Sequence, residues 1–119
     1  MAQHNELGKQ GEQIALNFLT KNGYEILEKN FRHQKAEVDL IAKKNNVLAA
    51  IEVKTRSSDF FGNPEEFVNV KKIKLITSAI DYYVIENDLD VEVRFDIIAI
   101  VVQGNKIKTE HLKNAFLHF

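Results

Sequence analysis

The chain has 119 residues, of which 45% are hydrophobic, and a formal net charge of −1. This length favours one domain with one core, and the charge argues against strong non-specific DNA binding. The absence of cysteine excludes disulfides and cysteine-based zinc sites. The N-terminus is too polar for a signal peptide, and no apolar run approaches the ~20 residues of a membrane span. We therefore expect a single cytoplasmic domain over residues 1–119 that does not associate with membranes.

The N-terminal segment predicts an amphipathic helix over residues 5–22. Its apolar residues recur at positions i, i+3 and i+4, which places them on one face. Asn5 is a suitable N-cap, and Gly23 is a suitable left-handed residue after the last turn. Glu12 falls about 100° from the centre of the apolar stripe, at 100° per residue. We therefore expect Glu12 at the edge of the buried face.

Three strands follow this helix, and the last two form a hairpin. The strands are predicted over residues 24–32, 35–43 and 47–56. Asn45 and Asn46 lie in the turn of the hairpin. Asparagine tolerates the positive φ that both central residues of a type I′ turn require. This turn predicts a register in which Lys44 pairs with Val47.

A second long helix is predicted over residues 63–87. Asn63 suits its N-cap, Pro64 suits its first position, and Glu66 lies at the capping-box position. Apolar residues recur with helical spacing along it, while Lys71 falls on or beside the opposite face. The helix should therefore cover one face of the sheet.

The C-terminal part predicts a central strand over residues 91–102. It is apolar on both faces after Asp96, which is typical of a strand covered on both sides. Residues 106–109 should pair back against it, and residues 111–119 should form a short helix. The resulting order, α-β-β-β-α-β, indicates an α/β fold with a mixed sheet between helices.

The predicted hairpin register gathers four charged side chains on one face. Glu37 falls opposite Lys54, where a cross-strand ion pair explains both. Asp39 falls opposite Glu52, and two carboxylates with Cβ atoms about 5 Å apart repel each other. Three arrangements would relieve this repulsion: a protonated carboxyl with a raised pKa, a lysine between the two, or a bridging divalent cation.

A divalent cation at Asp39 and Glu52 would have a chemical use. Mg²⁺ and Mn²⁺ often bind through one or two carboxylates and keep other positions for water and phosphate oxygens. Lys54 lies two residues from Glu52 on the same face, where its ammonium can stabilise charge on a phosphate or orient a water. These groups suit phosphodiester hydrolysis. The short D…ExK pattern is common by chance, and its placement on a hairpin is what gives it weight.

These motifs resemble the PD-(D/E)xK, or restriction-endonuclease-like, superfamily. More closely, the chain resembles the YraN-type family of small bacterial proteins, predicted endonucleases akin to archaeal Holliday-junction resolvases. The resemblance covers nearly the whole chain, through GKQGEQIALNFL, AEVDLIA, IEVKTR, VNVKKIKLI, RFDIIAI and HLKNAF. It implies an α-β-β-β-α-β core with a mixed sheet flanked by helices. Ala36 departs from the glycine that the family usually has before Glu-x-Asp.

The resemblance implies a Mg²⁺- or Mn²⁺-dependent endonuclease that acts on DNA, with branched or junction DNA as a candidate substrate. It implies that Asp39 and Glu52 hold the metal, that Lys54 is the catalytic lysine, and that Glu12 reaches the metal from the first helix. Glu37 is either an outer-shell group of the metal or the ion-pair partner of Lys54. No small-molecule cofactor beyond the metal is expected.

The charges are unevenly distributed along the chain. Basic residues outnumber acidic ones over residues 30–74, and acidic residues dominate residues 75–100. Arg32, Arg56 and Lys71 belong to the basic part and are candidate contacts for DNA phosphates; the alternative is an ordinary solvated side chain for each.

Two other classes of function remain open. One is a nucleic-acid-binding or interaction module that keeps the nuclease fold without catalysis, and the other is a structural or oligomeric scaffold. The complete set of Asp39, Glu52 and Lys54 favours the enzyme, because a degenerate nuclease would usually lose one of them. An enzyme that cuts junctions must address two strands, which favours a two-fold homodimer.

Overall fold

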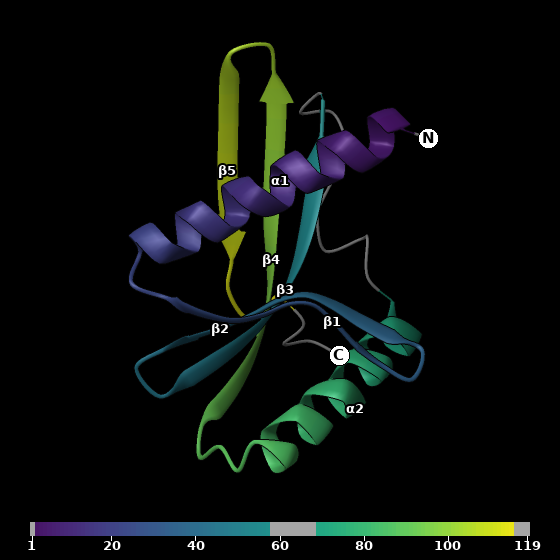
Figure 1. The fold of residues 1–119 in the computed structure, drawn as a ribbon, viewed down its shortest axis with the longest axis vertical. Coiled ribbons are helices and arrows are strands. Elements are labelled where there is room, and N and C mark those ends of the chain that lie inside the picture. Colours follow the sequence, from purple (N-terminus) through teal and green to yellow (C-terminus); the bar gives the residue numbers. More distant parts are fainter. Residues whose placement is uncertain (1, 58–68, 116–119) are drawn as a thin grey trace.

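The computed structural model describes residues 2–57 and 69–115, with side chains described from residue 6 onward. Within these residues the chain forms two helices and five strands (Figure 1). Their bounds are α1 Ala2–Lys21, β1 Glu25–His33, β2 Ala36–Lys44, β3 Val47–Arg56, α2 Val70–Glu86, β4 Glu92–Gln103 and β5 Lys106–Leu112.

The five strands form one mixed sheet in the order β1-β2-β3-β4-β5. The pairs β1–β2, β2–β3 and β4–β5 are antiparallel, while β3 and β4 are parallel. Parallel neighbours need a crossover connection, and α2 lies within the one between β3 and β4. This is the predicted α-β-β-β-α-β core of the restriction-endonuclease-like class, with β5 added at one edge.

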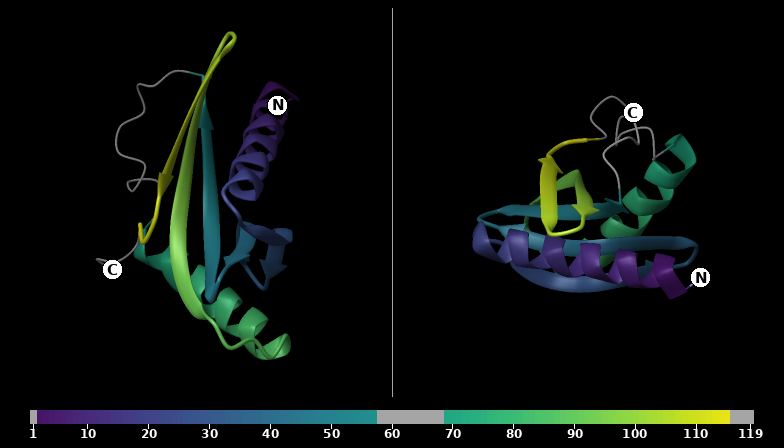
Figure 2. Two further views of the ribbon diagram at one scale, coloured as in Figure 1. Left: turned by 90° about the vertical axis from the view of Figure 1, so that its left-hand side faces the viewer. Right: turned by 90° about the horizontal axis from the view of Figure 1, so that it is seen from above.

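The two helices cover opposite faces of the sheet, as the view from above shows (Figure 2). Leu19 of α1 packs in one apolar cluster with Leu40, and Ile80 of α2 packs in the other with Ile41. Because Leu40 and Ile41 are consecutive residues of β2, both of its faces are buried. No helix in the described part of the chain is long and apolar enough to cross a membrane.

The C-terminal end of α1 agrees with the sequence-based prediction, and its N-terminal end does not. Gly23 adopts the predicted left-handed conformation, with φ of +88°. The N–H of Tyr24 then donates to the carbonyl of Leu19 at 2.9 Å, which closes the last turn. The helix begins at Ala2, so Asn5 lies inside it and is not its N-cap.

The β2–β3 hairpin has the predicted register from its turn inward. Lys44 pairs with Val47, and the same register continues to Leu40 and Ile51. Asn45 adopts a positive φ of +55°, but Asn46 does not, so the turn is not the predicted type I′. The ladder ends at the Leu40–Ile51 pair, and the predicted direct pairing of the residues beyond it is wrong.

α2 begins later than predicted. Asn69 is its N-cap, with extended φ and ψ of −115° and 173°, and its side chain accepts a hydrogen bond from the N–H of Lys72 at 2.8 Å. The residues expected to cap the helix, Asn63, Pro64 and Glu66, lie outside the described residues. Val70, the first residue of the helix, is exposed.

The C-terminal part is more extended than predicted. Strand β5 runs as far as Leu112, so residues 111 and 112 belong to the sheet and not to a short helix. Residues 113–115 form a turn, and the rest of the expected helix lies outside the described residues. β4 is central and buried on both faces from Asp96 to Val101, as the sequence predicts.

Candidate active site

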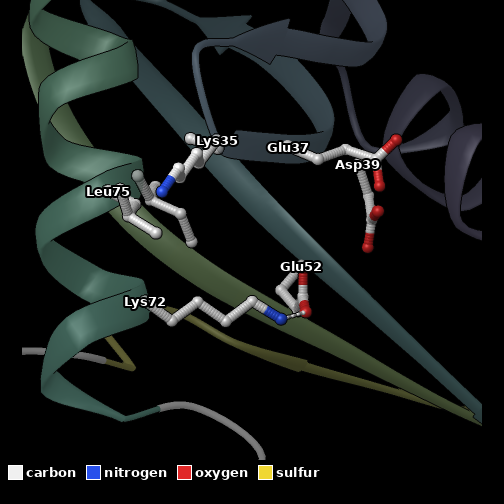
Figure 3. Close-up of a pocket in the computed structure, with 8 residues that line it drawn as sticks. Lys35, Glu37, Asp39, Glu52, Lys72 and Leu75 are labelled. Atoms are coloured by element: carbon white, nitrogen blue, oxygen red, sulfur yellow. Dashed lines mark hydrogen bonds and ion pairs between the residues drawn. The ribbon is translucent and has the colours of Figure 1, made fainter.

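A cleft of about 340 Å³ opens between the β2–β3 hairpin and α2 (Figure 3). Its lining residues are Lys35, Ala36, Glu37, Asp39, Glu52, Lys72, Leu75 and Ile76. Both carboxylates expected to hold a metal, Asp39 and Glu52, therefore face one cavity. They come from neighbouring strands of the sheet, as predicted.

Asp39 lies in the cleft, next to the end of the β2–β3 ladder. The last pair of this ladder is Leu40–Ile51, and Asp39 is the neighbour of Leu40 on β2. Its Oδ2 accepts a hydrogen bond from the N–H of Val53 at 2.8 Å, so a side chain takes the place of a ladder bond. Glu52 remains in the sheet on its other side, where β3 pairs with β4 at Ile97. The pairing of β2 with β3 thus ends next to the two acidic residues, Asp39 and Glu52.

The carboxyl group of Asp39 has a pKa close to neutral pH. Burial, and next the charge of Glu52, raise its pKa from 3.8 to about 7. The hydrogen bond from Val53 lowers this pKa, and the charge of Glu12 raises it. A carboxyl perturbed by burial and a specific neighbour in a cleft is a recognised mark of a functional site. A raised pKa is also one of the three arrangements expected to relieve the repulsion.

Glu52 is held by two lysines. Its side chain is only 7% exposed, and its Oε2 forms ion pairs with Lys72 of α2 and with Lys54, whose Nζ lies 3.7 Å away. Lys54 is therefore at the site where the motif places it. The second expected arrangement was a lysine between the two carboxylates, whereas the two ion pairs described here are both with Glu52, and one of the lysines comes from the helix.

Lys72 was missed by sequence reasoning. The predicted helix began too early, and the lysine predicted to contact phosphates was Lys71, which is exposed on α2. Lys72 lies four residues before the buried Ile76, and residues four apart lie on the same face of a helix. This spacing could have placed Lys72 on the side of α2 that faces the sheet.

Glu12 lies near Asp39 but does not line the cleft. It is half-buried on α1, as predicted, and borders a separate hollow of about 200 Å³ that also reaches Leu40. Its charge is felt by Asp39. Among residues 2–57 and 69–115, no three acidic or histidine side chains are grouped closely enough to hold a metal ion. Glu12 therefore does not complete a three-residue ligand set in this conformation.

The donor set of the cleft fits Mg²⁺ or Mn²⁺. Both ions accept one or two protein carboxylates and fill the remaining positions with water and phosphate oxygens. A divalent cation between Asp39 and Glu52 would offset the repulsion that raises the pKa of Asp39. The cleft also provides the volume that such a phosphate would need.

Glu37 and Arg32 interact with each other. Glu37 Oε2 lies 3.0 Å from Nε of Arg32, whose side chain is 77% exposed at the end of β1. The predicted Glu37–Lys54 ion pair is wrong, because the register that would oppose them ends before Asp39. Glu37 and the neighbouring Lys35 both line the cleft.

The other two candidate phosphate contacts lie on elements that border the cleft. Arg56 ends β3 and is half-buried, with Nη1 donating to the carbonyl of Thr55 at 3.0 Å. Lys71 is exposed in the first turn of α2, beside Lys72. Neither residue is among those that line the cleft.

Asp96 does not line the cleft, and its contacts are with other residues of the fold. It is fully buried and pairs with Arg94 at 2.9 Å. Nε2 of His111 lies 2.8 Å from Oδ2 of Asp96, and the N–H of Asn114 donates to Oδ1 at 3.1 Å. These contacts occupy both carboxylate oxygens within the fold.

Comparison with known proteins gives consistent matches along the chain. The Uncharacterised protein family UPF0102 matches residues 11–100. A UPF0102 protein of Flavobacterium psychrophilum is 55% identical and one of Christiangramia forsetii is 56% identical, each over 100% of both chains. A UPF0102 protein of Bacteroides thetaiotaomicron is 45% identical over 98% of this chain and 96% of its own. The matched region includes every residue that lines the cleft.

Proposed function

The chain belongs to the UPF0102 family, and we propose that it is a metal-dependent endonuclease that hydrolyses phosphodiester bonds in DNA. The observation that carries this proposal is that Asp39 and Glu52 face one cleft, that Lys54 Nζ lies 3.7 Å from Glu52, and that burial and Glu52 raise the pKa of Asp39 to about 7. The charge of Glu52 disfavours the ionised form of Asp39, and a bound divalent cation would offset this cost.

Each group has a definite role in this proposal. A bound Mg²⁺ or Mn²⁺ would polarise the phosphate and make an attacking water more acidic. Asp39 and Glu52 would hold the ion, and Asp39 would release its proton as it does so. Lys54, with Nζ 3.7 Å from Glu52, would place a positive charge where negative charge develops on the phosphate.

We propose DNA as the substrate class, with branched or junction DNA as the leading candidate. Arg32, Arg56 and Lys71 would contact phosphates on either side of the bond that is cut. Such contacts position the nucleic acid without reading its sequence. A two-fold homodimer would allow two strands of a junction to be cut together.

Cleavage assays test this function directly. Supercoiled, forked and four-way-junction DNA would be incubated with Mn²⁺ and either the natural protein, Asp39→Asn or Lys54→Gln. We expect each substitution to lower the cleavage rate roughly 100-fold or more, because it removes a group required at the reacting phosphate. Asp81→Asn makes the same chemical change at an exposed position of α2 and should cleave normally. Equal cleavage by all four proteins would identify a contaminant and overturn the proposal.

One observation favours a second candidate, a nucleic-acid-binding module without catalysis. Lys72 and Lys54 already pair with Glu52, so this carboxylate has counter-ions without a metal. DNA binding followed by fluorescence anisotropy would separate the two functions. The module predicts that all variants bind DNA equally, with or without Mn²⁺, and that none of them cleaves it.

A further inference from the structure

Lys72 occupies a helix position that is unfavourable for a lysine. It is the third residue of α2, whose first turn contains no acidic residue and begins Val70-Lys71-Lys72. The N-terminus of a helix carries partial positive charge, so cations in its first turn are destabilising. The backbone N–H of Lys72 donates a hydrogen bond to Oδ1 of the N-cap Asn69 at 2.8 Å, which fixes the backbone of Lys72. A favourable partner elsewhere must offset this cost.

That partner is Glu52 of β3. The side chain of Lys72 extends from α2 across the cleft, and Nζ forms an ion pair with Oε2 of Glu52 (Figure 3). The same oxygen also pairs with Lys54. One nearly buried oxygen is therefore shared by two ammonium groups, although one of them would already satisfy its charge.

We propose that Lys72 is an exchangeable counter-ion of this site. It neutralises Glu52 while the site holds no divalent cation, and it turns to a phosphate of the bound nucleic acid once a divalent cation takes Glu52. The inference rests on the proposed function, because it takes Asp39 and Glu52 as the metal ligands. It adds a positioning residue that comes from the helix and lies outside the strand motif.

The geometry allows this exchange. Lys72 is 34% exposed, and its ammonium stands on a flexible four-carbon chain that can move without moving the helix. The adjacent cleft of about 340 Å³ is also lined by Lys35. A phosphate there would meet two ammonium groups close to the positive end of α2, which is a favourable setting for an anion.

Metal affinity provides the first test. Isothermal titration with Mn²⁺ would compare the natural protein with Lys72→Gln and with Lys74→Gln, which removes the same charge from an exposed position of α2. We expect Lys72→Gln to bind Mn²⁺ about 5- to 10-fold more tightly, because the metal no longer displaces an ammonium. Lys74→Gln should bind as the natural protein does.

DNA affinity provides the second test. With Ca²⁺ in place of Mn²⁺, a four-way junction would be titrated by fluorescence anisotropy and the titration repeated in EDTA. We expect Lys72→Gln to bind DNA about 5-fold more weakly than the natural protein in Ca²⁺ and equally well in EDTA. An equal loss in both conditions would overturn the exchange, since it would show that Lys72 contacts DNA without regard to the metal.

The possible failures are distinguishable. If Asp39→Asn abolishes Mn²⁺ binding but Lys72→Gln does not tighten it, the exchange is wrong and the proposed function stands. If the natural protein does not bind Mn²⁺, or Asp39→Asn binds it equally well, both fall. If Lys72→Gln does not fold, Lys72→Arg replaces it. A guanidinium competes more strongly for Glu52, so Mn²⁺ binding should weaken, and unchanged or tighter binding would overturn the exchange.

Discussion

Asp39 links the chemistry of the cleft to the stability of the fold. Burial and the charge of Glu52 raise its pKa to about 7, so the folded protein binds this proton more tightly than the unfolded chain does. The contribution of Asp39 to the free energy of unfolding therefore falls as the pH rises from about 4 to about 7. Above that range the fold bears the full cost of the ionised pair.

Asp39→Asn should consequently stabilise the protein when no metal is present. The amide removes the buried charge, and its oxygen can still accept the hydrogen bond from Val53. At pH 8 in EDTA we expect the free energy of unfolding to rise by roughly 1–3 kcal/mol, with a smaller gain at pH 5. Urea unfolding at both pH values measures this, with Asp81→Asn as the control. A variant less stable than the natural protein at pH 8 would contradict it.

Mn²⁺ should stabilise the natural protein but not Asp39→Asn, which reverses the order of their stabilities. A ligand that binds only the folded state raises the melting temperature, and the proposed ion needs the Asp39 carboxylate. We expect millimolar Mn²⁺ to raise the melting temperature of the natural protein and to leave that of Asp39→Asn unchanged. Differential scanning fluorimetry measures both. Equal shifts in the two proteins would place the bound metal elsewhere.

At the scale of elements, α1 and β3 approach each other closely at Gly11. A Cβ added there would overlap the hydroxyl of Thr55 and lie 2.7 Å from Thr55 Cβ. The Cβ of Thr55 is fixed to the strand, so it cannot yield by rotation as the end of a flexible side chain would. Glycine at this position therefore sets the distance between the helix and the sheet.

Gly11→Ala should destabilise the protein although alanine is the better helix former. We expect the free energy of unfolding to fall by about 1–3 kcal/mol as the helix is pushed from the strand. Gly8→Ala is the matched control, because nothing lies within 4 Å of its added Cβ. It should be neutral or stabilise by up to about 1 kcal/mol. Chemical denaturation of both variants measures the difference, and equal effects would contradict the close approach.

The hairpin shows how far the sequence predicts this fold. Turn position and apolar alternation predicted the pairing from Lys44–Val47 to Leu40–Ile51, because both depend on neighbouring residues. The end of the ladder was not predictable in this way. It depends on the side chain of Asp39 taking the N–H of Val53, a contact between residues 14 positions apart.

The start of α2 shows a second limit. The local sequence favoured Asn63 as the N-cap, because Pro64 and Glu66 follow it, whereas the structure places the cap at Asn69. The cap at Asn69 places Lys71 and Lys72 in the first turn of α2. The strand residues Asp39, Glu52 and Lys54 were predicted to converge, whereas the ion pair of Lys72 with Glu52 depends on how the helix packs on the sheet.

At the scale of the whole molecule, the sheet is covered on both faces, and this determines where charge is tolerated. Glu52 and Asp96 are the buried charged residues of the described chain, and each is held by basic partners. Glu52 lies at a cleft where its partners can change. Asp96 lies in the interior, where Arg94, His111 and Asn114 join β4, β5 and the turn after β5.

Asp96 should therefore control the acid stability of the fold. Burial alone would raise its pKa, but hydrogen bonds from His111 and Arg94 outweigh burial and hold the pKa below its ordinary value of 3.8. A carboxyl with a lowered pKa stabilises the fold above its unfolded pKa, and this contribution is lost as the pH falls through the folded value. The natural protein should accordingly lose stability below about pH 4.

Asp96→Asn should remove the stability that the Asp96 carboxylate contributes, together with the pH dependence of that contribution. It leaves the half-buried Arg94 without its ionic partner, so we expect the free energy of unfolding at pH 7 to fall by about 3–5 kcal/mol. Below about pH 4 the difference between variant and natural protein should narrow, because the natural carboxylate is then being protonated. Urea unfolding from pH 7 to pH 3 measures it, with the exposed Asp90→Asn as control. Curves for Asp96→Asn and the natural protein that stay parallel below pH 4 would show that Asp96 does not carry the acid sensitivity of the sheet.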